Sequence, residues 1–220
     1  MALVFLQRVE LTLFAAAFLC GAVVTATLTR TQTSFSGSCP LYGVAALNGS
    51  SLALSCPSAS SVCHFVVWVS GLLALYCLLL LLYWIYSSYI EESHRSSVGL
   101  CVALGISATA TFLILVSACI LRFGTSSLCS SITALNRTNS CSEAQKMSWT
   151  PPGTALQFYA NLQTAETSSW VNLVLWCLIL MLQVIQFKSK ATLYISSHTR
   201  YWPQERADSK DVSETDALVG

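Results

Sequence analysis

The chain has 220 residues and a formal net charge of +1; 54% of its residues are apolar and only 10% are charged. Soluble proteins are about one quarter charged, because charged side chains coat their surface. This composition therefore argues against an ordinary soluble protein and favours a lipid environment. The balanced charge also gives no basic field that would attract nucleic acid, so no nucleic-acid partner is expected.

Four long apolar segments follow one another along the chain. They comprise residues 9–28, 65–90, 98–121 and 170–187. Each is close to the roughly 17 to 25 residues that an α-helix needs to cross a bilayer, and none has a charged residue at its centre. A soluble helix bundle is the alternative, but it rarely needs four helices that are apolar on all sides. The predicted fold class is an all-α membrane protein with a four-transmembrane-helix bundle.

The first segment also resembles a secretory signal, since Arg8 precedes it and the small residue Ala26 lies near its end. Glu10 and the length of the apolar run favour a helix that is not cleaved. Both interpretations place the following loop outside the cytosol. We predict that this segment remains as the first transmembrane helix.

The segments divide the rest of the chain into two long loops, a short linker and a tail. We expect exoplasmic loops at 29–64 and 122–169, a cytosolic linker at 91–97, and a cytosolic tail at 188–220 that follows the membrane domain 1–187. The tail ends in polar, acidic sequence without apolar periodicity and is expected to be disordered.

Two glycosylation acceptors indicate the orientation. Asn48 begins the triplet Asn-Gly-Ser and Asn136 begins the triplet Asn-Arg-Thr, so both are predicted glycosylation sites. They lie in the two long loops, which an even number of crossings places on one side of the membrane. The excess of Lys and Arg in the linker and tail favours the same orientation. Both termini are therefore predicted to lie in the cytosol.

The ten cysteines fall into two groups of five. One group lies within the apolar segments, where thiols behave as small apolar side chains. The other lies in the loops, in a compartment that permits disulfides. A zinc site at Cys56, Cys63 and His64 is disfavoured because structural sites usually bring cysteines in C-x₂₋₄-C pairs. We expect no metal site, no cofactor and no catalytic residue.

Several stretches resemble one known family. They are LQRVELTLFAAAFLCGAV, SFSGSCPLYGV, SACILRFGTSSLC, SCSEAQK, WTPPGTALQFY and SSWVNLVLW, with SETDALVG in the tail. These motifs resemble the transmembrane protein 179 family, and most closely its B member. The resemblance implies a four-pass membrane protein, and it supplies a fold and a topology but no reaction.

The family pattern also places four of the loop cysteines. Its cysteines match Cys39, Cys63, Cys129 and Cys141, whereas Cys56 has no counterpart and is the expected odd thiol. Four cysteines allow three connectivities. We favour Cys39 with Cys63 and Cys129 with Cys141, each pair closing one loop. Bonds between the two loops are the alternative.

The sequence proposes no enzymatic reaction. It lacks a phosphate loop, a G-x-S-x-G elbow, an H-E-x-x-H helix and a dinucleotide fingerprint. Glu10 is the one acidic residue within the four apolar segments, and we expect it among the lipid headgroups at the cytosolic edge rather than with a buried partner in the bundle. Asn172, Gln183 and Gln186 are expected to bridge helices.

By elimination, the expected function is that of a non-enzymatic multi-pass membrane glycoprotein that acts as an interaction, scaffolding or trafficking partner of other membrane proteins. A channel or transporter, or an auxiliary subunit of one, is the alternative. Small residues along the first and third apolar segments leave a homo-oligomer open. The expected location is the plasma membrane or a secretory or endosomal granule membrane.

The topology predicts that both acceptors carry glycans. Glycosidase treatment of the full-length protein from cells should lower its apparent mass on a gel. Asn48→Gln and Asn136→Gln should each remove part of this shift, and the double variant should remove all of it. A wild-type protein that does not shift would leave the predicted orientation without support.

Overall fold

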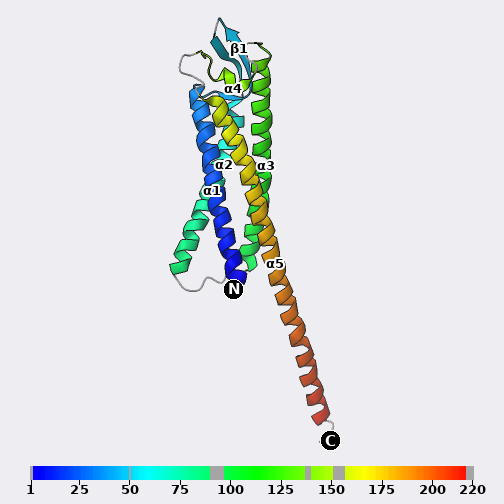
Figure 1. Ribbon diagram of the computed structural model, residues 1–220. Coiled ribbons are helices and arrows are strands. Elements are labelled where there is room, and N and C mark those ends of the chain that lie inside the picture. The colour runs from blue at the N-terminus through cyan, green and yellow to red at the C-terminus, as the bar shows by residue number, and fades with distance from the viewer. Residues whose placement is uncertain (1, 50, 90–96, 137–139, 151–156, 217–220) are drawn as a thin grey trace.

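The computed structural model describes residues 2–49, 51–89, 97–136, 140–150 and 157–216 (Figure 1). The predicted linker 91–97 lies outside these residues, apart from Ser97. Four long helices dominate the described part of the chain: α1 (Ala2–Ser34), α2 (Ser60–Tyr89), α3 (Ser97–Thr133) and α5 (Phe158–Asp216). Each contains a stretch that is long and apolar enough to cross a membrane. The predicted four-helix membrane fold is thus confirmed.

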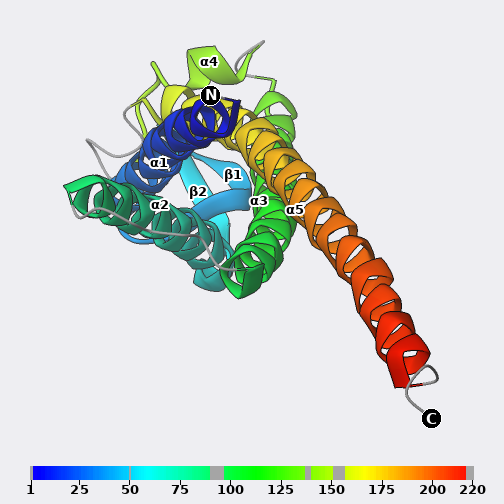
Figure 2. The ribbon, with the colours of Figure 1, turned by 90° about the horizontal axis from the view of Figure 1, so that it is seen from below.

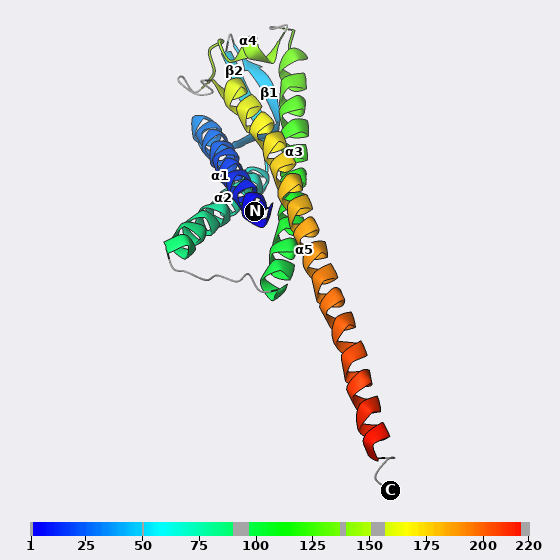
Figure 3. The same cartoon turned by 60° about the horizontal axis from the view of Figure 1, so that its bottom comes forward.

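The four helices form an open arc. α1 packs against α2 and α5, and α5 packs in turn against α3, whereas α2 and α3 have much less contact with each other. The view from below shows this order, and α2 diverges from its neighbours toward its C-terminal end (Figures 2 and 3). α5 therefore connects α3 to α1 and, through α1, to α2.

Close helix contacts and one large aromatic residue hold the arc together. Trp176 of α5 is fully buried; its ring meets the edge of Phe14 in α1 at 6.0 Å and stacks with Tyr76 in α2 at 6.4 Å, measured between centroids. At Gly21 of α1, an added Cβ would lie 3.0 Å from the carbonyl oxygen of Ser70 in α2. Such close approach of backbones is the usual basis of helix association in lipid.

The first long loop folds into a two-stranded antiparallel sheet, which an all-α description leaves out. Strand β1 (Cys39–Asn48) pairs with β2 (Ser51–Ser58), and Asn48 lies opposite Ser51 across the turn. Gly49 in this turn has φ +65°, a conformation that glycine adopts at low cost. The fold class is therefore mostly helical, with one hairpin at the end of the bundle (Figure 1).

The helices are longer than the apolar segments that predicted them. α3 continues past residue 121 to Thr133, and α5 begins at Phe158 rather than near residue 170. The short helix α4 (Cys141–Ala144) lies between them. α5 also extends to Asp216, so the backbone of 188–216 is helical where we expected a disordered tail. A preformed span removes the cost of helix nucleation, which the composition of the tail alone does not reveal.

The Gly21 contact makes a prediction about stability. Gly21→Leu should lower the free energy of unfolding in detergent by about 1–3 kcal/mol, because the added side chain would force α1 and α2 apart. Gly105→Leu is the matched control, since a Cβ at Gly105 of α3 meets nothing within 4 Å. Thermal unfolding of both variants compares them. Equal melting temperatures for the two variants would contradict the packing described here.

Candidate functional site

Two disulfides build the end of the molecule that carries the hairpin. We call this end the head; it consists of the hairpin, α4 and the adjoining turns of α3 and α5. Cys39 at the start of β1 is bonded to Cys63 in the first turn of α2, with the Cα atoms 5.8 Å apart. Cys129 near the end of α3 is bonded to Cys141 of α4, with a Cα separation of 5.3 Å. These are the two pairs that the sequence analysis favours.

The remaining loop cysteine, Cys56, is exposed and forms no disulfide. The alternative zinc site would need the thiolate of Cys63, which is bonded to Cys39 instead. The described residues contain no group of three or more His, Cys, Asp or Glu side chains that could hold a metal ion. Four of the five loop cysteines thus form covalent links between elements.

An aromatic cluster fills the base of the head. Phe35 after α1, Trp149 of the second loop and Phe158 at the start of α5 meet edge to face, with centroids 5.3 to 5.8 Å apart. The indole N–H of Trp149 donates a hydrogen bond to the carbonyl oxygen of Ala144 at 2.9 Å. Burial of the three rings, together with the hydrogen bond of the indole N–H, attaches the second loop to the end of α1 and the start of α5.

The hairpin rests on α3 through one of its faces. Leu41 is fully buried beside Gly124, where an added Cβ would lie 2.9 Å from the Leu41 side chain. The backbone N–H of Ala45 donates to the hydroxyl of Ser131 in α3 at 3.2 Å. On β2, Leu52 exchanges backbone hydrogen bonds with the second loop. The hairpin is therefore held both by α3 and by the other loop.

The hairpin also exposes three large apolar side chains. Tyr42, Val44 and Leu47 are 41%, 48% and 38% exposed, and we call them the outer hairpin patch. They lie in β1, at the far end of the molecule from the tail (Figure 1). All three lie outside the four candidate membrane spans. Apolar groups exposed outside the membrane indicate an interaction surface when they gather on one element.

The two predicted glycosylation sites are accessible on the head. Asn48 ends β1 and Asn136 follows α3, and both side chains are exposed. The other acceptor residues Ser50, Arg137 and Thr138 lie outside the described residues. Both asparagines are at the end of the bundle that carries the disulfides. Their glycosylation stays a prediction.

Glu10 occupies a different position from the one we expected. Its side chain is only 3% exposed and lies between α1 and α5, not among headgroups. The amide of Gln183 donates to one carboxyl oxygen at 3.2 Å and the amide of Gln186 donates to the other at 3.1 Å. The sequence shows these glutamines three residues apart, but it does not show that their helix lies against α1.

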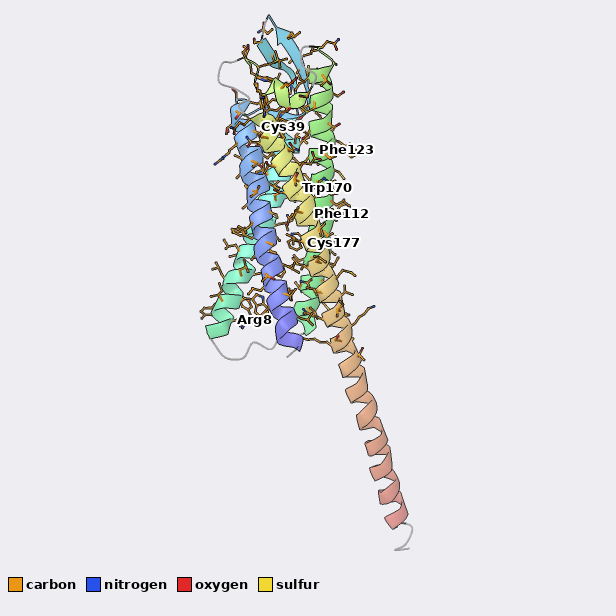
Figure 4. All side chains as sticks on the ribbon, in the orientation of Figure 1. Arg8, Cys39, Phe112, Phe123, Trp170 and Cys177 are labelled. Carbon is orange, nitrogen blue, oxygen red and sulfur yellow. A yellow bond between two sulfur atoms is a disulfide. The ribbon has the colours of Figure 1, made fainter. Side chains whose placement is uncertain are left out.

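This Glu10 cluster, defined as Glu10, Gln183 and Gln186, is an unusual arrangement for a transmembrane bundle. A buried carboxyl is costly at lipid depth and persists where neighbouring groups hydrogen-bond to it. The two amide donors provide such bonds and tie the first transmembrane helix to the last. The cluster lies toward the tail end of the bundle, near the labelled Arg8 (Figure 4).

Comparison with known proteins identifies the family. The family described as Transmembrane protein 179/179B Claudin domain matches residues 6–219. The chain belongs to this family. It is 72% identical to Transmembrane protein 179B of Homo sapiens over 220 residues, which is 100% of this chain and 97% of the human protein. The corresponding protein of Danio rerio is 42% identical over 180 residues, 80% of this chain and 82% of the fish protein.

The Glu10 cluster predicts a difference between two substitutions. Glu10→Leu should lower the free energy of unfolding in detergent by about 1–3 kcal/mol, because it leaves the buried amide of Gln183 and the half-buried amide of Gln186 without this acceptor. Glu10→Gln keeps a hydrogen-bonding amide in the same place and should cost less. Thermal unfolding measures both. A leucine variant as stable as wild type would show that the cluster does not stabilise the bundle.

Proposed function

We propose that this multi-pass membrane protein is a non-enzymatic glycoprotein that acts as an interaction, scaffolding or trafficking partner of other membrane proteins. The observation that supports this proposal is the outer hairpin patch of Tyr42, Val44 and Leu47, which is exposed on the head outside the lipid-covered spans. Tyrosine and other large apolar side chains contribute strongly to protein interfaces when a partner excludes water from them.

The way in which the patch is held supports the same function. Both hairpin strands are constrained, β1 by its disulfide to α2 and by its contact with α3, and β2 by backbone bonds to the second loop. A surface that is already ordered loses less conformational entropy when it binds. A rigid patch on a disulfide-linked head is therefore suited to recognising the exoplasmic part of a neighbouring protein.

Disulfides and glycosylation acceptors support a location in the secretory system. Disulfides persist in oxidising compartments, and the acceptors need passage through the same route. We place the protein in the plasma membrane or in a secretory or endosomal granule membrane, with the head on the exoplasmic side and the termini in the cytosol.

The patch makes the proposal testable. Full-length wild type and the triple variant Tyr42→Ser, Val44→Ser, Leu47→Ser would be purified from cells in mild detergent, and partners quantified by mass spectrometry. We expect a stoichiometric membrane partner of the wild type whose recovery falls by about tenfold or more in the triple variant, since such anchors carry much of an interface's energy.

The double variant Glu143→Ser, Lys146→Ser is the matched control, because both residues are exposed on the head beside α4 and outside the patch. It should retain the partner. A wild type without a stoichiometric partner, or a partner equally retained by the triple variant, would contradict the proposal. A channel or transporter as the partner would instead favour the auxiliary-subunit function.

A further inference from the structure

A polar cleft of about 510 Å³ lies between α3 and α5 where these helices enter the head. The cleft is next to the Cys129–Cys141 disulfide and on a different part of the head from the hairpin patch. Its α3 wall includes Arg122, Thr125 and Ser126, and its α5 wall includes Tyr159, Gln163 and Glu166. Nothing in the proposed interaction function uses this space.

The two walls carry opposite charges. The guanidinium of Arg122 lies 3.2 Å from the carboxylate of Glu166, and their side chains are 63% and 17% exposed. An arginine has five N–H donors, so this single contact leaves most of them for another acceptor. Ion pairs near the surface contribute little to stability. A role in holding α3 to α5 therefore does not by itself explain why this pair is present.

Thr125 provides a second observation on the α3 wall. It is 6% exposed, and its hydroxyl oxygen has no hydrogen-bond partner among the described residues. Other α3 hydroxyls donate to their own helix, Thr111 to the carbonyl oxygen of Ser107 and Thr133 to that of Cys129. Thr125, one turn from Arg122, thus lines the cleft and has a buried hydroxyl without a partner among the described residues.

The cleft opens at the level expected for lipid headgroups. Phe123 follows Arg122 directly, Trp170 lies one turn after Glu166, and both side chains are exposed. Figure 4 shows them below the head and above Phe112 and Cys177, on the side where α3 meets α5. Exposed aromatic rings, tryptophan above all, concentrate at the membrane interface. The polar walls therefore begin where the lipid-facing surface ends.

We propose that this cleft binds the zwitterionic headgroup of phosphatidylethanolamine from the adjacent leaflet. The phosphate lies against α3, where Arg122 and the Thr125 hydroxyl donate to it. The ammonium lies against α5, where the carboxylate of Glu166 and the side-chain carbonyl of Gln163 accept its N–H groups. A primary ammonium matches these acceptors better than a quaternary one, which has no N–H to donate.

The experiment uses the full-length protein reconstituted in nanodiscs of phosphatidylethanolamine, phosphatidylcholine and phosphatidylglycerol in equal parts, with identical acyl chains. After extraction into mild detergent, native mass spectrometry counts the retained lipids. Wild type should be enriched in phosphatidylethanolamine. Arg122→Gln should lower the amount of phosphatidylethanolamine retained per protein by about tenfold, as expected for loss of a charge-assisted contact. Thr125→Val should reduce it by a smaller factor.

Glu166→Gln should change the preference rather than abolish binding, because the phosphate contacts remain while the ammonium loses its carboxylate. Phosphatidylglycerol should then be retained as well as phosphatidylethanolamine. Lys146→Gln, which removes an exposed head charge outside the cleft, is the matched control and should behave like wild type. The swap Arg122→Glu, Glu166→Arg keeps an ion pair but exchanges the charges of the two walls. The lipid retained by this double variant should therefore show no enrichment in phosphatidylethanolamine.

Three outcomes of the nanodisc experiment would overturn the proposal. They are wild-type lipid that matches the bulk mixture, a wild-type preference for phosphatidylglycerol, and enrichment that survives both Arg122→Gln and the swap. Addition of O-phosphoethanolamine at millimolar concentration tests whether the cleft instead takes a soluble compound with the same phosphate and ammonium groups. If it displaces the retained lipid and raises the melting temperature as much as the lipid does, the cleft takes a soluble metabolite and the lipid assignment is wrong.

Discussion

The burial of Trp176 is the contact on which the membrane bundle depends. Helices in lipid gain no hydrophobic energy from each other, so shape and close packing must hold them. Trp176 provides such close packing for three helices at once. Its ring belongs to α5 and contacts Phe14 of α1 and Tyr76 of α2. The ring also sets the rotation of α5, because Asn172, Ile179 and Gln183 share its buried face.

That rotation determines which polar groups of α5 meet which neighbour. About two turns toward the tail, Gln183 reaches Glu10 of α1, and toward the head Glu166 reaches Arg122 of α3. The two contacts lie toward opposite ends of the bundle. One polar cluster is enclosed, whereas the other is open to the interface. Helix α5 thus carries a polar contact at each end of the bundle, and the packing of the Trp176 ring sets the direction in which both polar side chains point.

Hydropathy was sufficient to predict the four spans, because long apolar runs have few other uses. It could not predict the full helices: residues such as Arg122 and Thr133 are polar, yet α3 continues through them because the hairpin and the disulfide pack against it. Asn48-Gly49 is a strong hairpin signal that we interpreted only as part of a glycosylation acceptor. The partners of Glu10 depend on which helices are neighbours, which no single segment specifies.

The candidate surfaces were harder still to predict than the fold. Tyr42, Val44 and Leu47 are ordinary apolar residues in the sequence, and only the pairing of β1 with β2 and its contact with α3 separates those that are buried from those that are exposed. The cleft needs two helices whose facing residues are far apart in the sequence, as the separation of 44 between Arg122 and Glu166 illustrates. Tertiary contacts of this kind are outside what local patterns encode.

The disulfide between Cys39 and Cys63 has a mechanical consequence. It connects the root of the hairpin to the first turn of α2, the long helix with the least support from the rest of the molecule. A force applied to the hairpin is therefore transmitted through a covalent bond to the top of a transmembrane helix. The disulfide and the close contact around Gly21 hold the first half of α2 against the bundle, whereas its other end diverges from the neighbouring helices (Figure 3).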